Sequence, residues 1–285
     1  MTQQPYPEVR RALAADATPD FRAPGFDLEA YRDQVREANL AQPREDVASA
    51  VDVDANGVPC RLFTPTDALP GVIVHLHGGG FVFNDIDVHD GICRRLANRA
   101  RRRVLSIGYR KPPEHPFPAA IEDIDTVVQW LGEQDLPGPW AIHGDSAGGN
   151  LALVGALRHP GRFSAVVLIY PFLDPQLAFP SWDEADSSGF TRAEGSWYWE
   201  QYAPRDQWNN PDLAPLNATN FGDLAPTFVA TAEFDPLRDE GEELARRIVE
   251  AGMVGTDVHA HGAQASHSGS SSANRRGRLS RSAGR

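Results

Sequence analysis

The sequence predicts an α/β fold in which a mostly parallel β-sheet is covered by helices on both faces. From about residue 50 onward, short apolar segments alternate with longer segments of helical periodicity. That alternation is typical of parallel strands joined by crossover helices. The chain also has 285 residues, 41% of them hydrophobic and 23% charged, which is enough to bury the core that such a sheet needs.

The expected elements can be placed in chain order. Residues 1–45 are expected to be helical, because apolar side chains recur there three and four residues apart. These side chains are Leu28, Tyr31, Val35 and Ala38. Buried strands are expected at 72–76, 104–109, 140–144, 165–170 and 227–232, and a further strand is expected at 255–261. Helices are expected between them at 88–102, 119–132, 147–158 and 239–252.

Residues 174–208 interrupt the alternation and hold four of the six tryptophans of the chain. One interpretation is a small second core beneath a long insertion. Another is a lid whose aromatic side chains line an apolar substrate pocket, and the two are compatible. We expect residues 174–210, together with residues 1–45, to form a helical cap over the sheet.

The last 24 residues differ in composition from the rest of the chain. Residues 262–285 are rich in serine, arginine, glycine and alanine, and Leu279 is their only large apolar residue. Such a segment cannot bury enough apolar surface to offset its chain entropy, so we expect disorder. The abrupt change also suggests the hypothesis that the chain leaves its ancestral reading frame near residue 260.

Composition argues against several classes of protein. A net charge of −12 disfavours a nucleic-acid partner, because phosphates would be repelled. No segment reaches 18 consecutive apolar residues, so no membrane span is expected. The first residues also lack the apolar core of a secretory signal, and a cytoplasmic location is therefore expected. Cys60 and Cys93 are too few for a disulfide framework, and both are expected to be buried.

The segment G-D-S-A-G at 144–148 fits the G-x-S-x-G pattern of a nucleophile elbow. In such an elbow a sharp strand-to-helix turn lifts the serine Oγ clear of the sheet, and small neighbours let the backbone turn. An apolar strand precedes this motif and a helix-forming segment follows it, as the elbow requires. The context favours a nucleophilic Ser146 over a serine of an ordinary turn.

The segment H-G-G-G at 77–80 directly follows the expected strand 72–76. Glycines at such a place allow a loop whose backbone N–H groups face outward as an oxyanion hole. A phosphate-binding loop is the alternative, but neither a lysine nor a G-x-G-x-x-G pattern follows. Because acyl transfer needs both a nucleophile and oxyanion donors, the two motifs together predict an acyl-transfer site.

On these motifs the chain resembles the hormone-sensitive-lipase family of α/β-hydrolases, which includes many bacterial carboxylesterases. The matching segments are H-G-G-G-F (77–81), Y-R-K-P-P-E-H-P-F-P-A-A (109–120), G-D-S-A-G-G-N-L-A (144–152), Y-P-F-L-D-P (170–175) and D-P-L-R-D-E-G (235–241). The resemblance implies a three-layer α/β-hydrolase fold over residues 1–261 with a helical cap. It also implies hydrolysis of carboxylic esters. The chain departs from the family at Lys111-Pro112-Pro113, where an apolar residue followed by Ala-Pro is more usual.

By resemblance, Ser146 is the nucleophile, and the backbone amides of Gly79, Gly80 and Ala147 form the oxyanion hole. The expected substrate is a small-molecule ester, and the aromatic segment suggests small to medium acyl chains. No cofactor and no metal is expected to be required. Nothing in the sequence indicates which oligomeric state the protein adopts.

Asp235 is the implied acid of the triad. It follows the expected strand 227–232, where a carboxylate could orient a histidine ring and stabilise its imidazolium form. Asp239 is the rival acid, but its place before a helix-forming segment suits helix N-capping better.

The triad histidine is the least defined member. The family ends its last strand with a loop that reads roughly Tyr-x-Gly-x-x-His-Gly-Phe, followed by a long helix, and neither occurs here. His267, 32 residues after Asp235, is the nearest candidate, and His259 and His261 are alternatives. The His-x-His pair at 259–261 could also bind a metal, but no third ligand lies nearby in sequence.

Because the family's histidine motif does not occur here, two alternatives to an active esterase stay open. The chain could be an impaired esterase that keeps the fold and pocket without a competent base. It could also be a ligand-binding protein on the same scaffold, since the plant gibberellin receptors resemble this family and lack the triad histidine. Ligand-dependent thermal stabilisation without turnover would favour the second of these.

Overall fold

The computed structural model describes residues 19–184, 189–261 and 278–282, with side chains up to residue 255, and these residues form one nine-stranded sheet. The strand order is β1-β2-β4-β3-β5-β6-β7-β8-β9. The strands are β1 (Ser49–Ala55), β2 (Val58–Thr64), β3 (Val72–Leu76), β4 (Arg103–Ile107), β5 (Trp140–Asp145), β6 (Ala165–Ile169), β7 (Thr227–Ala232), β8 (Gly255–His261) and β9 (Arg278–Ser282). Six adjacent strands are parallel: β4, β3, β5, β6, β7 and β8. The pairings β1–β2, β2–β4 and β8–β9 are antiparallel.

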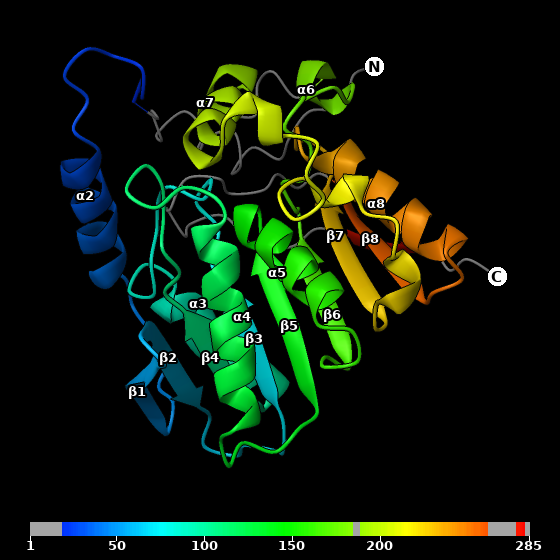
Figure 1. Cartoon of the computed structure of the whole chain (residues 1–285). Helices are drawn as coiled ribbons and strands as arrows, with labels where there is room; N and C mark the ends of the chain where they lie inside the picture. Colours follow the sequence, from blue (N-terminus) through cyan, green and yellow to red (C-terminus); the bar gives the residue numbers. More distant parts are fainter. Residues whose placement is uncertain (1–18, 185–188, 262–277, 283–285) are drawn as a thin grey trace.

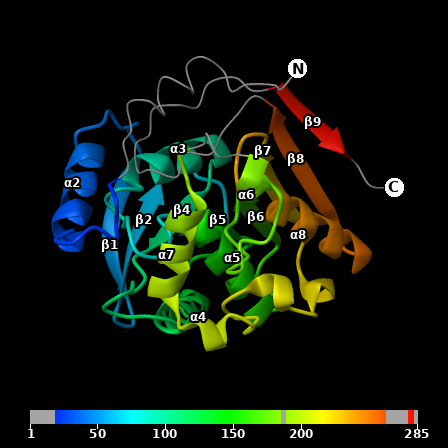
Figure 2. The same cartoon turned by 90° about the horizontal axis from the view of Figure 1, so that it is seen from above.

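Helices cover both faces of the sheet, which confirms the expected three-layer α/β architecture. Viewed from above, α3 lies on one side of the central strands and α4 and α5 lie on the other (Figure 2). The helices are α2 (Leu28–Leu40), α3 (Asp90–Ala100), α4 (Ala119–Gly132), α5 (Ala147–Arg158), α6 (Ser181–Glu184), α7 (Arg192–Tyr202) and α8 (Arg238–Glu250). Three short 3₁₀ turns follow α7, at Arg205–Gln207, Pro215–Asn217 and Phe221–Asp223.

The aromatic segment that was expected to form a cap contains the helices α6 and α7. Figure 1 shows α6 and α7 above the sheet, with α2 beside them at one edge. Helix α7 begins with a capping box, in which Thr191 accepts a hydrogen bond from the Glu194 N–H and Glu194 accepts one from the Thr191 N–H. Of the expected helix over residues 1–45, only α2 is described as helix, and residues 1–18 lie outside the described residues.

Two parts of the sheet differ from the sequence prediction. The hairpin β1–β2 was not predicted, because Ser49–Ala55 is exposed at most positions and lacks an apolar run. At the other edge, residues 278–282 form β9 against β8, whereas residues 262–285 were expected to be disordered. Backbone groups alone can form that pairing, because the edge of β8 offers N–H and C=O groups to any extended segment. Residues 262–277 and 283–285 lie outside the described residues.

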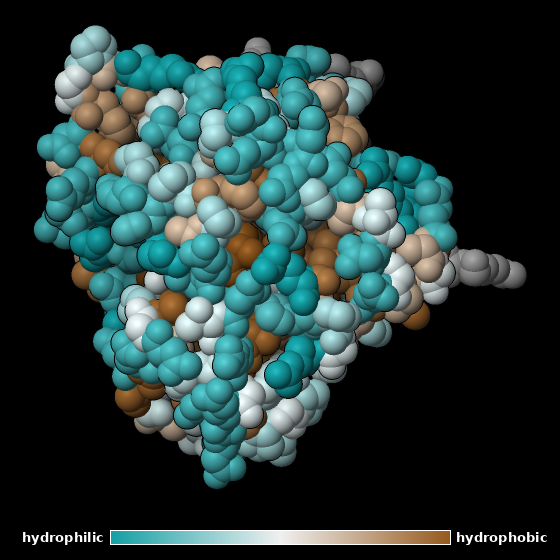
Figure 3. All heavy atoms as spheres, in the orientation of Figure 1, coloured by the Kyte–Doolittle hydropathy of each residue, from teal (hydrophilic) through white to brown (hydrophobic). Residues whose placement is uncertain are grey.

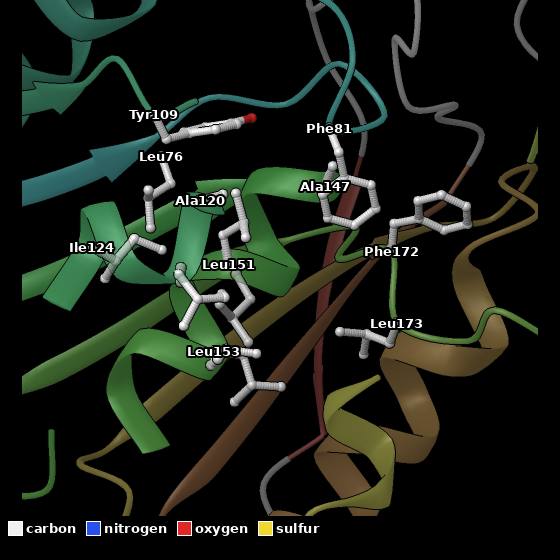
Figure 4. Packing of buried hydrophobic residues seen from close by; sticks show 14 of the residues in the cluster. Leu76, Phe81, Tyr109, Ala120, Ile124, Ala147, Leu151, Leu153, Phe172 and Leu173 are labelled. Atoms are coloured by element: carbon white, nitrogen blue, oxygen red, sulfur yellow. The ribbon is translucent and has the colours of Figure 1, made fainter. Parts of the chain in front are cut away.

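The main core lies on the face of the sheet covered by α4 and α5. Every residue of α5 from Ala147 to Leu157 is buried, because this helix lies between the sheet and α4. Figure 4 shows Leu151 of α5 and Ile124 of α4 packed together with Leu76 of β3. The nucleophile candidate therefore precedes a helix that the core holds on all sides.

The face of the molecule drawn in Figure 3 is predominantly polar. On the face seen in Figure 3, hydrophilic residues cover most of the area, and apolar residues show as separate smaller areas. Within the described part of the chain, no helix combines the length and apolar composition that a membrane crossing requires.

Candidate active site

Ser146 lies in the turn between β5 and α5 with a backbone conformation that residues other than glycine rarely adopt. Its φ is 54° and its ψ is −124°. Strand β6 and the segment after it hold this conformation: the Ser146 N–H donates to the carbonyl of Ile169 at 2.9 Å, and the Ser146 carbonyl accepts from the Phe172 N–H at 3.0 Å. The residue is 8% exposed. The result is a strained serine at the tip of a strand, as a nucleophile elbow requires.

The two outer glycines of the motif allow the turn to close. A Cβ at Gly144 would lie 2.0 Å from the Gly148 carbonyl oxygen, and a Cβ at Gly148 would lie 2.1 Å from the Leu76 carbonyl oxygen. Both contacts are with backbone, so no side-chain movement could relieve them. Any larger residue at either position would push α5 away from β5 or from β3.

The glycine loop after β3 is equally constrained. Gly79 has a φ of 115° and Gly80 a φ of 58°, both in the region that favours glycine. A Cβ at Gly79 would lie 2.6 Å from the Phe83 carbonyl oxygen, and one at Gly80 would lie 2.2 Å from the ring of Tyr198. The loop therefore passes directly beneath α7.

The Gly78–Gly79 peptide is polarised from its carbonyl side. The carbonyl of Gly78 accepts from Nδ1 of His77 at 2.9 Å and from the side-chain amide of Asn84 at 3.2 Å. Burial holds the pKa of His77 well below its ordinary value, so this ring is a neutral donor. Because hydrogen bonds to a peptide oxygen strengthen the N–H of the same peptide, these contacts favour Gly79 as a donor to an oxyanion.

Ala147 supplies the third expected amide. It is fully buried and is the first residue of α5. The first N–H groups of a helix have no partner within the helix, and the helix dipole adds partial positive charge there. The structure thus brings the expected oxyanion residues to the ends of β3 and β5, which are adjacent strands.

Asp235 lies after β7 and is fully buried. Its Oδ1 accepts from the Leu237 N–H at 2.9 Å, which fixes the carboxylate in the turn before α8. Strand β7 is separated from β5 by β6 alone, so Asp235 and Ser146 end strands at the same edge of the sheet.

The rival Asp239 has a different set of contacts. One oxygen accepts from the Ser181 N–H at 2.8 Å, and the other from the guanidinium of Arg238 at 2.8 Å. The N-cap of α8 is Leu237, so Asp239 lies in the first turn and is not the cap that the sequence suggested. Asp239 joins α8 to the cap helix α6, and both of its oxygens are used in doing so.

The histidine candidates divide between described and undescribed parts of the chain. His267 lies outside the described residues. His259 and His261 belong to β8, where His259 is paired with Thr231 of β7 and Ala260 with Ala232. This register places the backbone of His261 at the end of β8 next to the turn that carries Asp235.

Aromatic side chains join the cap to the glycine loop. Phe81, which follows the loop, stacks on Tyr202 of α7 with ring centroids 3.9 Å apart and planes 3° apart. Phe172 contacts Trp199 with centroids 4.7 Å apart. All four rings are fully buried, so these aromatic side chains form a core beneath the cap.

A strained serine at a strand-to-helix elbow, a glycine loop on the adjacent strand and a buried carboxylate two strands away define a serine hydrolase of the α/β type. The family comparison agrees: the family model described as "alpha/beta hydrolase fold" matches residues 73–265. The chain belongs to this family and, within it, to the hormone-sensitive-lipase-like carboxylesterases.

Named relatives cover most of the chain. It is 34% identical to Esterase LipI of Mycobacterium tuberculosis, over 87% of this chain and 83% of that protein. It is 31% identical to an arylesterase of Saccharolobus solfataricus, over 89% of this chain and 91% of that protein. Among solved structures, an esterase of Pyrobaculum calidifontis superposes with a TM-score of 0.79 at 33% identity, covering 92% of this chain and 90% of that one.

Proposed function

We propose that this carboxylic ester hydrolase works through a triad of Ser146, Asp235 and a histidine from the C-terminal region. The observation that carries the proposal is the strained backbone of Ser146 at the β5–α5 elbow. The histidine takes the Ser146 proton as Oγ attacks the ester carbonyl, and Asp235 orients the ring. Water then hydrolyses the acyl-enzyme with the same histidine as base.

The developing oxyanion is bound by the backbone amides of Gly79, Gly80 and Ala147 in this proposal. The positive φ values of the two glycines and the helix-start position of Ala147 support that assignment. Fixed amide donors stabilise the tetrahedral intermediate more than the planar ester, so they lower the barrier and not only the ground state.

Asp235 is preferred to Asp239 as the acid because the carboxylate of Asp239 already binds Ser181 and Arg238. For the base, His267 is the first candidate, and His259 and His261 are the alternatives. The substrate is a small-molecule ester, and the aromatic core beside the glycine loop supports small to medium apolar acyl chains. A cytoplasmic location and the absence of a nucleic-acid partner stay predictions from composition.

Hydrolysis of p-nitrophenyl acetate and butyrate by the purified full chain tests this proposal. Ser146→Ala should reduce kcat by about 10⁶-fold, to the background of the oxyanion hole and binding. Asp235→Asn should reduce it by about 10⁴-fold. Asp239→Asn is the matched control and should keep most of the rate. Equal losses in the two aspartate variants would refute the assignment of Asp235.

Three single variants, His259→Gln, His261→Gln and His267→Gln, locate the base. The variant that falls to the level of Ser146→Ala identifies it. If wild type itself is no faster than Ser146→Ala, the site lacks a competent base and the proposed activity is wrong. Ligand-dependent thermal stabilisation under those conditions would then support a ligand-binding protein.

A further inference from the structure

Behind the nucleophile elbow lies a group of histidines that the proposed reaction does not use. His75 is in β3, His143 is in β5 and His89 precedes α3, and they are far apart in sequence. His75 and His89 are buried, and Asp145, the residue before Ser146, completes the group. Burying imidazoles in a core is costly unless their nitrogens find partners.

Three donor atoms of this group converge. Nε2 of His75 lies 3.1 Å from Nδ1 of His89, which lies 3.8 Å from Oδ1 of Asp145. All three atoms lie within 4.8 Å of one another. Ligand atoms around a tetrahedral Zn²⁺ ion, at bond lengths of about 2.0–2.2 Å, are roughly 3.3–3.5 Å apart. The distances of 3.1 Å and 3.8 Å from Nδ1 of His89 lie on either side of that value.

The second nitrogen of His75 has its own partner. Nδ1 of His75 lies 2.9 Å from Nδ1 of His143, to which it is paired across β3 and β5. If His75 donates its Nδ1 proton to His143, its Nε2 presents a lone pair to His89 and Asp145. Metal-binding histidines usually donate the other ring N–H in this way, because it fixes the tautomer and the ring orientation.

Hydrogen bonding alone leaves this group incomplete. With His75 in that tautomer, the Nδ1–H of His89 can satisfy Nε2 of His75. Oδ1 of Asp145 is then left without a donor, and it has no hydrogen-bond partner among the described residues. A cation between the three atoms would satisfy all of them.

We propose that Nε2 of His75, Nδ1 of His89 and Oδ1 of Asp145 form a structural site for a divalent transition-metal ion. Two imidazoles and a carboxylate suit Zn²⁺ best among the common ions. The fourth position is left to water or to Nε2 of His77, a buried ring nitrogen that has no hydrogen-bond partner among the described residues. The ring centroid of His77 lies 5.6 Å from that of His89.

Such an ion would join β3, β5 and the start of α3 directly behind Ser146. Its role is to hold the elbow and the glycine loop together, and the proposed ester hydrolysis takes no step through it. The site does not depend on which histidine acts as the base.

Metal binding is tested on the full chain after treatment with a chelator and its removal. Adding Co²⁺ should give the visible ligand-field absorption of a four-coordinate site, saturating at one ion per chain, and Zn²⁺ should displace it. Zn²⁺ should also raise the Tm in proportion to the logarithm of its concentration above the Kd. Absence of both signals in wild type would overturn the proposal in favour of a hydrogen-bonded histidine cluster.

Substitutions of individual histidines identify which residues bind the metal. His75→Gln and His89→Gln should abolish the Co²⁺ spectrum and the Tm shift. The exposed His115→Gln is the matched control and should keep both signals. The double variant His259→Gln/His261→Gln should also keep them, since a signal lost there would assign the metal to the His-x-His pair and overturn the proposal.

X-ray absorption of the Zn²⁺ complex of wild type gives an answer even if the His75 and His89 variants fail to fold. Two imidazoles and at least one oxygen ligand are expected at the metal. A shell of oxygen ligands alone would mean adventitious surface binding and would refute the site.

Discussion

Lys111 is the only lysine of the chain and provides a test of how burial acts on a charged group. Its Nζ donates to the carbonyl of Asn84, and it lines a cavity of about 680 Å³ together with Asp85 and Tyr109. Burial lowers the pKa of Lys111 from 10.5 to about 8, although the nearby Asp85 opposes the shift. At neutral pH the charged Lys111 ammonium therefore destabilises the folded protein.

The sign of the effect on stability follows from proton binding. Between pH 8 and pH 10.5 the unfolded chain binds more protons at this lysine than the folded chain, so the free energy of unfolding rises with pH. This gain in the free energy of unfolding is complete above pH 10.5, and it is lost as the pH falls through 8. The full difference is about 3.4 kcal/mol, of which about 2 kcal/mol is gained between pH 7 and pH 9.5.

Urea unfolding of wild type and Lys111→Met at pH 7 and pH 9.5 measures this contribution. Relative to Lys111→Met, wild type should gain about 2 kcal/mol between the two pH values. Lys111→Arg is the matched control: it keeps a cation that does not titrate in this range, so it should show no such gain.

A direct measurement is available because a chain with one lysine, labelled with ¹³C-lysine, gives one side-chain signal for Lys111. That signal should titrate near pH 8. A midpoint near 10.5, or equal pH dependence in wild type and Lys111→Met, would refute the reasoning.

Three further predictions concern the glycine loop and two buried side chains, Glu240 and Tyr202. Gly80→Ala should reduce esterase kcat by at least about 100-fold in the p-nitrophenyl acetate assay, because the new Cβ meets the Tyr198 ring and displaces a proposed oxyanion donor; a rate within a few-fold of wild type would contradict this. Burial raises the pKa of Glu240, whose carboxylate accepts from the Asp174 N–H, so its stabilisation is lost as the pH rises through the folded pKa. The Tm of Glu240→Gln should therefore rise relative to wild type from pH 5 to pH 8, and a constant difference would count against it. The hydroxyl of Tyr202 is buried without a hydrogen-bond partner among the described residues, so Tyr202→Phe should leave the urea-unfolding free energy unchanged or slightly higher, whereas Tyr202→Ala should lower it by about 3–5 kcal/mol. A clear loss in Tyr202→Phe would show that the hydroxyl has a partner.

Most of the parallel strands were predictable because they are short apolar segments bounded by polar or turn residues. Strand β3, expected at 72–76, is Val72–Leu76, and β7, expected at 227–232, is Thr227–Ala232. The missed hairpin also carried a signal. Asn56 and Gly57 have φ values of 54° and 92°, and an Asn-Gly pair between two alternating segments is a strong indication of a tight hairpin turn.

The site was predictable only where its residues are adjacent in sequence. Ser146 and the glycines belong to short motifs whose backbone requirements can be inferred locally. The pairing of His75 with His143 depends instead on the register of β3 against β5, which no local pattern specifies. The role of Asp239 in holding α6 was likewise hidden, because its partner Ser181 lies 58 positions away in sequence.

The contact between Gly80 and Tyr198 has a consequence for recombination between related enzymes. The segment that holds α6 and α7 is an attractive unit to exchange, since both helices lie outside the sheet. Here the ring of Tyr198 in α7 occupies the space beside Gly80 that any side chain there would need. A chimera that imports a foreign α7 therefore changes the surface that packs against this glycine loop. Under the proposed role of the loop in the oxyanion hole, substrate range and turnover will change together unless Tyr198 is transferred with the loop.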